Sequence, residues 1–163
     1  MDSEAQVIVA AEITRQANDS RQLAPMIEQV EANAGSKPKA VSADAGYWSE
    51  ANVGDERVAG VDLHIATGRQ KHEEKVEPAS GAPPEDASAK EAMRHKLRTE
   101  AGHAIYKMRK AIVEPVFGQI KERRGFRRFS FRGLENVGLE WKLICLTGNL
   151  LKLFRSGWSP QTA

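Results

Sequence analysis

The spacing of apolar residues changes along the chain, and this change constrains the fold more than any other feature. Up to residue 66, short runs rich in β-branched residues alternate with segments of helical spacing. After residue 89 only helical spacing is found. Because alternating strands and helices form a sheet with crossover helices, the first part predicts an α/β arrangement and the second predicts a set of helices.

The elements expected in the first part are short. Strands are predicted at 6–13, 39–43 and 61–66, with helices over about 23–34 and 49–58 between them. In the second part the spacing predicts helices over 89–98, 100–123 and 134–154, and an extended segment over 126–132 in which aromatic and basic residues alternate.

A polar stretch separates the two parts. Residues 68–89 contain three prolines, two glycines and the run KHEEK, with few apolar residues, which is typical of a loop or linker. The predicted organisation is therefore an α/β core at 1–67, a polar loop or insertion at 68–89, a helical part at 90–156 and a tail at 157–163.

Composition excludes several classes of protein. With 163 residues, 40% of them hydrophobic, the chain suits one ordinary domain with a core. Its one cysteine, Cys145, allows neither an intramolecular disulfide nor a cysteine cluster for zinc. The most apolar stretch, 137–154, contains Glu140, Lys142 and Lys152, so no membrane span is expected, and no signal peptide is visible. We expect a soluble protein of the cytoplasm.

The net charge of +2 conceals a strong asymmetry. Residues 91–132 carry twelve Lys and Arg against four Asp and Glu, a balance of +8, whereas residues 1–60 carry five against ten, a balance of −5. A concentrated basic block is typical of a surface that binds a polyanion. The alternative is an amphipathic helix whose basic face is only solvated.

Two carboxylates stand out by position. Asp44 follows a predicted strand, where ligands gather in open α/β sheets, although Asp in that place also serves as a turn residue. Glu114 has apolar neighbours within a predicted helix, so we expect it to be partly buried. A buried carboxylate needs a partner, which would be Lys110 or Lys121 in an ion pair, or else a metal ion.

The basic block interleaves cations with aromatic rings. Arginine binds phosphate oxygens through two parallel hydrogen bonds, and aromatic rings stack on exposed bases, although the phenylalanines could instead pack inward. The candidate surface comprises Tyr106, Arg109, Lys121, Arg123, Arg124, Arg127, Arg128 and Arg132, with Phe126, Phe129 and Phe131 between them.

Three stretches together resemble the DDE transposases of bacterial insertion sequences. They are ADAGY at 43–47, YKMRKAIVEPVFGQIK at 106–121, and GFRRFSFRGLENV with WKLICLTGNLLKL at 125–153. By this resemblance Asp44 matches the second aspartate of the family and Glu114 its glutamate. Tyr106, Arg109 and Lys121 match the Tyr–Arg–Glu–Lys signature.

The resemblance implies a partial ribonuclease-H-like sheet with helices, followed by a mostly helical C-terminal region. It implies metal-dependent cleavage and transfer of DNA strands, with Asp44 and Glu114 as catalytic residues that bind Mg²⁺ or Mn²⁺. The implied partners are DNA at the element ends and at the target, and a homo-oligomer is compatible with it. Tyr106, Arg109 and Lys121 would contact DNA, as would Arg123, Arg124, Arg127 and Arg128.

Two departures from the family pattern qualify these expectations. Four residues instead of three separate Arg109 from Glu114, which rotates Glu114 by about 100° on a helix. Only one predicted strand, 6–13, precedes the first helix, and Asp2 is wrongly placed to be the first aspartate. We therefore expect an N-terminally truncated transposase that is inactive alone. The alternative is a non-catalytic, DNA-binding remnant.

Overall fold

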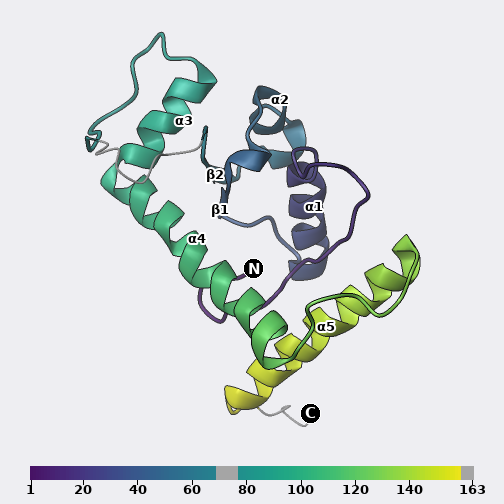
Figure 1. Ribbon diagram of the computed structural model, residues 1–163. Coiled ribbons are helices and arrows are strands. Elements are labelled where there is room, and N and C mark those ends of the chain that lie inside the picture. The colour runs from purple at the N-terminus through teal and green to yellow at the C-terminus, as the bar shows by residue number, and fades with distance from the viewer. Residues whose placement is uncertain (69–76, 159–163) are drawn as a thin grey trace. The chain divides into compact units, whose positions relative to one another are not determined.

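The computed structural model describes residues 1–68 and 77–158, and its elements are labelled in Figure 1. The chain forms two compact units. The sheet unit comprises Gln16–Lys110, and the helical unit comprises Met1–Arg15 with Ala111–Ala163. Parts of the predicted polar loop (69–76) and tail (159–163) lie outside the described residues.

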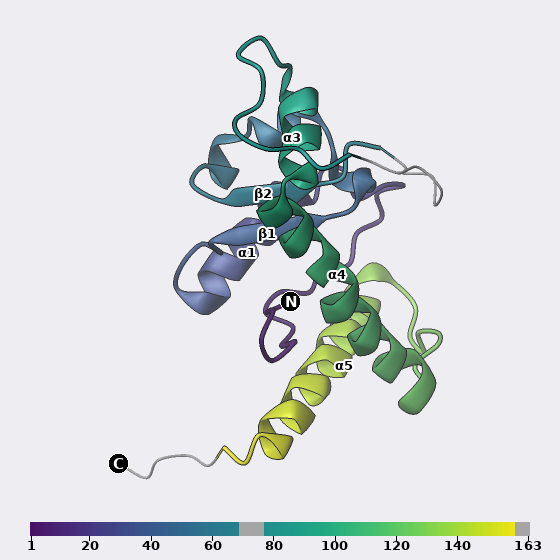
Figure 2. The ribbon, with the colours of Figure 1, turned by 90° about the vertical axis from the view of Figure 1, so that its left-hand side faces the viewer.

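The sheet unit is built on two parallel strands that lie side by side (Figure 2). Strands β1 (Ala40–Ala43) and β2 (Asp62–Ile65) pair with Ala40 opposite Asp62 and Ala43 opposite Ile65. Both were predicted, and the parallel pairing confirms a mixed α/β arrangement. Between residues 40 and 65 the chain crosses over through three short turns of helix, namely η1 (Ala45–Tyr47), α2 (Glu50–Val53) and η2 (Glu56–Val58).

Two predicted helices, α1 and α3, belong to this unit. Helix α1 (Leu23–Ala34) ends at Gly35, which has the positive φ of 78° that glycine adopts without strain. Helix α3 (Ala89–Arg98) starts with a capping box between Ser88 and Glu91. The apolar side of α1, both strands and η2 supply the core, whose buried members are Leu23, Ala24, Ile27, Ala43, Val58, Leu63 and Ile65.

The predicted strand at 6–13 is wrong. Within the described residues this segment pairs with no strand. Instead the side chain of Asn149 donates a hydrogen bond to the carbonyl of Ile8 and accepts one from its N–H, each at 2.9 Å. β-branched residues favour an extended backbone, but they do not specify what satisfies its hydrogen bonds.

The helical unit contains the last part of α4 (Glu100–Gly118), a π-helical turn η3 (Gln119–Arg123) and α5 (Leu134–Arg155). The predicted helix over 100–123 is thus α-helical only to residue 118. The predicted extended segment at 126–132 is irregular and unpaired with any described strand. The buried core comprises Ile8, Val116, Ile120, Ile144 and Cys145.

Helix α5 has one buried and one exposed apolar face. Its core side includes Ile144 and Cys145, and burial raises the pKa of the Cys145 thiol to about 11. The other side carries a row of exposed side chains, Leu139, Leu143, Leu146, Leu150, Leu153 and Phe154. Among the described helices, none is both long and apolar enough to cross a membrane.

Candidate metal-binding carboxylates and nucleic-acid interface

Asp44 lies directly after β1, at the carboxyl end of the strand pair. Its Oδ1 accepts the backbone N–H of Gly46 at 2.9 Å, which caps the turn η1. The residue is exposed to solvent. Asp44 therefore acts as a turn residue, and its exposed carboxylate is also accessible to a cation.

A second carboxylate contributes negative charge near this strand end. Burial raises the pKa of the half-buried Tyr47 phenol, and the negative charges of Asp19 and Asp44 raise this pKa further. Asp19 therefore contributes to the electrostatic environment of Tyr47, which its separation from Tyr47 along the chain does not indicate.

Glu114 is exposed, so the expectation of partial burial is wrong. Val116 and Ile120 point into the core of the helical unit, and a rotation of 100° per residue places Glu114 on another side of α4. The core-facing residues Val116 and Ile120 therefore do not bury Glu114, although they lie close to it in sequence. Glu114 forms no ion pair with Lys110 or Lys121 among the described residues.

The donor chemistry of Asp44 and Glu114 suits a hard cation, because Mg²⁺ and Mn²⁺ prefer carboxylate oxygens. Asp44 belongs to the sheet unit and Glu114 to the helical unit, so a shared metal site stays a prediction. In residues 1–68 and 77–158, neither unit by itself gathers three His, Cys, Asp or Glu side chains that could hold a metal ion. Asp2 is engaged in an N-terminal turn, where it accepts the N–H of Ala5 at 2.6 Å.

The signature residues on α4 contact one another or their neighbours. The guanidinium of Arg109 lies 5.5 Å from the centre of the Tyr106 ring, and its buried Nε has no hydrogen-bond partner within the described part of the chain. Lys121, on η3, places its ammonium 5.7 Å from the centre of the Phe117 ring. Such cation–π contacts orient the positive charges without neutralising them.

Two of the predicted DNA-binding arginines are held by the protein. Arg124 donates to the carbonyl of Ile144 at 2.8 Å and to the hydroxyl of Thr147, and its guanidinium lies 5.0 Å from the centre of the Phe126 ring. Arg127 pairs with Glu122. Arg124 thus attaches the start of the basic segment, residues 123–132, to α5, and the charge of Arg127 is partly neutralised.

Three other arginines have unpaired side chains. Arg123, Arg128 and Arg132 are exposed, and within the part of the chain that the structure describes their guanidinium groups form no hydrogen bond or ion pair. An exposed, unpaired guanidinium keeps all of its donors for a phosphate group. Within the described residues, these three guanidinium cations of the predicted surface have no hydrogen bond, ion pair or ring contact.

Sequence reasoning missed one polar residue in this region, Glu140. It is only 9% exposed, and its two carboxylate oxygens accept the N–H of Ser130 at 2.9 Å each, while Oε2 also accepts that of Phe131 at 3.1 Å. These hydrogen bonds, with that of Ser130 the strongest, lower the pKa of Glu140. The sequence did contain one indication of its role, because Glu140 is a charged residue between the apolar positions Val137 and Ile144.

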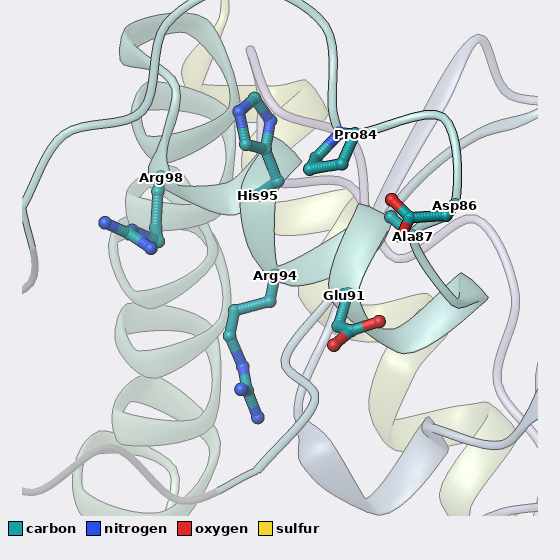
Figure 3. Close-up of a pocket in the computed structure, with 7 residues that line it drawn as sticks. All are labelled: Pro84, Asp86, Ala87, Glu91, Arg94, His95 and Arg98. Atoms are coloured by element: carbon teal, nitrogen blue, oxygen red, sulfur yellow. The ribbon is translucent and has the colours of Figure 1, made fainter.

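A groove of about 330 Å³ also runs along α3 (Figure 3). Its side chains Arg94, His95 and Arg98 point in different directions, and Arg98 donates through Nε to the carbonyl of Glu77 at 2.8 Å. The side chains therefore do not converge on a common ligand. The groove is lined by Pro84, Asp86, Ala87, Glu91, Arg94, His95 and Arg98.

One family of known proteins matches more than half of the chain. The match is to the family described as a transposase DDE domain, and it covers residues 65–154. It includes Glu114, the signature residues on α4, the basic segment and Glu140, but it does not include Asp44. No curated protein and no solved structure gives a significant match.

Proposed function

Since the chain belongs to the transposase DDE-domain family, we propose that it acts in DNA transposition through metal-dependent cleavage and transfer of DNA strands. We further propose that the sheet unit corresponds to part of a ribonuclease-H-like sheet. The parallel pairing of β1 and β2, with a crossover between them, supports this assignment. The observation that carries the proposal is the family match over 65–154, which spans both Glu114 and the basic segment.

In this proposal Asp44 and Glu114 hold Mg²⁺ or Mn²⁺. Both side chains are exposed, so a cation and a DNA backbone can reach them from solvent. When bound, such ions activate a water molecule or a 3′-hydroxyl group and stabilise the leaving oxygen of a phosphodiester. The residues of this chain would bind the metal, while the cationic side chains would bind the DNA.

The proposed DNA contacts are made mainly by the unpaired arginines. Arg123 and Arg128 are exposed and keep all their donors for phosphate oxygens, whereas Arg124 and Arg127 are engaged with protein groups. Phosphate contacts of this kind give affinity without base specificity. Tyr106, Arg109 and Lys121 would add contacts from α4 and η3, and DNA at element ends and targets would be the partner.

The test is a titration of duplex DNA at several salt concentrations. Each phosphate that the protein neutralises contributes about 0.9 to the slope of log K against log salt, so Arg123→Gln with Arg128→Gln should lower the slope by about 2. The matched control is Arg15→Gln with Arg21→Gln, which removes two exposed arginines that lie outside the basic block and have no hydrogen bond or ion pair within the described residues. We expect a small change for the control. Binding that does not vary with salt would contradict the proposal.

A non-catalytic role in DNA binding is the second candidate, because only two metal-binding carboxylates are assigned. Mg²⁺ gives up its bound water reluctantly, so two protein ligands would hold it weakly. This second candidate therefore predicts little or no nicking of supercoiled plasmid by this chain with Mg²⁺. Strong nicking that disappears in Asp44→Asn and in Glu114→Gln would favour the catalytic role. DNA binding without nicking would favour the second candidate.

A further inference from the structure

The basic segment is ordered by a carboxylate that is not itself part of the cationic surface. Glu140 projects from α5, and its oxygens accept three backbone hydrogen bonds from Ser130 and Phe131 at 2.9–3.1 Å. Segments without helix or strand must satisfy their backbone donors in another way. In this segment, the donors of two successive residues converge on one side chain.

A ring contact fixes the residue before these two. The ring of Phe129 meets that of Trp141 edge to face at a centroid distance of 6.3 Å, and Trp141 stacks on Phe117 at 6.1 Å. Trp141 directly follows Glu140 on α5. The backbone at 129–131 is therefore held by two adjacent side chains of one helix.

The held residues are flanked by two exposed cations. Arg128 immediately precedes Phe129, and Arg132 immediately follows Phe131; neither guanidinium has a partner among the described residues. Fixing the backbone between them fixes the points from which both side chains extend. A surface ordered before binding loses less conformational entropy when a ligand binds.

We propose that Glu140 is a positioning residue for DNA binding, which presets the backbone at 129–131 so that Arg128 and Arg132 reach phosphates of the same duplex. This inference rests on the proposed function. For the substitution of Glu140, it predicts a change in DNA affinity opposite to the change that electrostatic repulsion alone predicts. A carboxylate close to a phosphate-binding surface repels DNA, so its neutralisation alone would strengthen binding. Loss of positioning weakens binding instead.

The first experiment compares duplex DNA binding of the wild-type chain, Glu140→Gln and Glu135→Gln by fluorescence anisotropy. Glu135 is exposed in the first turn of α5 and provides a control with the same change of charge. We expect Glu140→Gln to bind more weakly, with a salt slope lower by roughly 2, the value that corresponds to two phosphates. Glu135→Gln should bind as tightly as the wild type or more tightly.

A second measurement separates positioning from general damage to the fold. Amide hydrogen exchange in the DNA-free protein should show loss of protection at Ser130 and Phe131 in Glu140→Gln, while amides in the middle of α5 stay protected. Arg128→Gln should also cost less affinity in the Glu140→Gln background than in the wild type. If Glu140→Gln does not fold, Phe129→Ala removes the ring contact alone and should weaken binding in the same way.

The outcomes distinguish this inference from the proposed function. A wild-type chain that does not bind duplex DNA overturns both. A wild-type chain that binds, with Glu140→Gln binding equally well or more tightly, overturns the positioning role alone. Weaker binding without any change in amide protection at Ser130 and Phe131 also overturns it. Weaker binding together with loss of that protection supports it.

Discussion

The two units provide hydrogen-bond partners for the backbone of their non-helical segments in different ways. In the sheet unit, β1 and β2 form a ladder with each other, and the N–H of Asp62 extends it to the carbonyl of Lys39 at 2.9 Å. In the helical unit, segments 6–13 and 126–132 pair with no described strand. Side chains of α5 donate or accept hydrogen bonds with the backbone of each segment instead, through Asn149 at Ile8 and through Glu140 at Ser130 and Phe131.

This difference determines how each unit should respond to substitution. A ladder distributes its hydrogen bonds over the backbones of many residues, so no single side chain is essential to it. The helical unit concentrates the same task in a few polar side chains of one helix, and five buried hydrophobic residues form its core among those that the structure describes. Single substitutions in α5 should therefore have large and local effects.

The largest expected effect compares two adjacent residues of α5. Ile144 is 4% exposed and Leu143 is 59% exposed. Ile144→Ala should lower the free energy of unfolding by about 2–5 kcal/mol, because it leaves a cavity in a small core. Leu143→Ala should change it by less than about 0.5 kcal/mol, as measured by urea unfolding. An equal decrease for Leu143→Ala would show that its face is covered in the protein.

The next effect concerns Asn149, whose side chain makes the backbone hydrogen bonds to Ile8 that a neighbouring strand would otherwise make. Asn149→Ala leaves the N–H and carbonyl of the buried Ile8 without partners. We expect a decrease of about 2–3 kcal/mol in the free energy of unfolding. Asn136→Ala is the control, since Asn136 is exposed on the same helix and donates only to the carbonyl of Arg132. If the two variants unfold alike, segment 6–13 does not depend on Asn149.

The smallest expected effect is a response to acid. Hydrogen bonds from Ser130 and Phe131 lower the pKa of Glu140 below its ordinary value of 4.5. The carboxylate therefore stabilises the folded unit above pH 4.5, and this contribution is lost as the pH falls through the lowered pKa. Amide exchange at Ser130 and Phe131 should accelerate over that range. The pH dependence should be absent in Glu140→Gln, and its persistence there would assign it to another group.

Sequence patterns predicted those elements whose hydrogen bonds are local or whose apolar spacing is regular. The strands at 40–43 and 62–65 and the helices at 23–34, 89–98 and 134–155 all lie close to their expected positions. The segment 6–13 was assigned wrongly because its partner, Asn149, is distant in sequence. No local sequence pattern shows that the side-chain amide of one distant asparagine will make the hydrogen bonds that a neighbouring strand would make.

The candidate site was predictable to a more limited extent. Asp44 lies at a strand end as expected, but the exposure of Glu114 was missed because apolar residues beside it in sequence face a different side of α4. Which arginines are unpaired depends on tertiary contacts, such as that of Arg124 with Ile144. Glu140 was recognisable only as a charge on a buried face.

The most direct test of the account asks whether one carboxylate from each unit serves a common metal ion. Mn²⁺ binding can be measured by water proton relaxation in the wild type, Asp44→Asn, Glu114→Gln and the double variant, with Glu135→Gln as control. We expect weak Mn²⁺ binding, which each single variant weakens further. The Mn²⁺ affinity of the double variant should fall by a smaller factor than the product of the two single-variant factors. Mn²⁺ affinity that is unchanged by Glu114→Gln, or decreases that combine independently, would contradict a shared site.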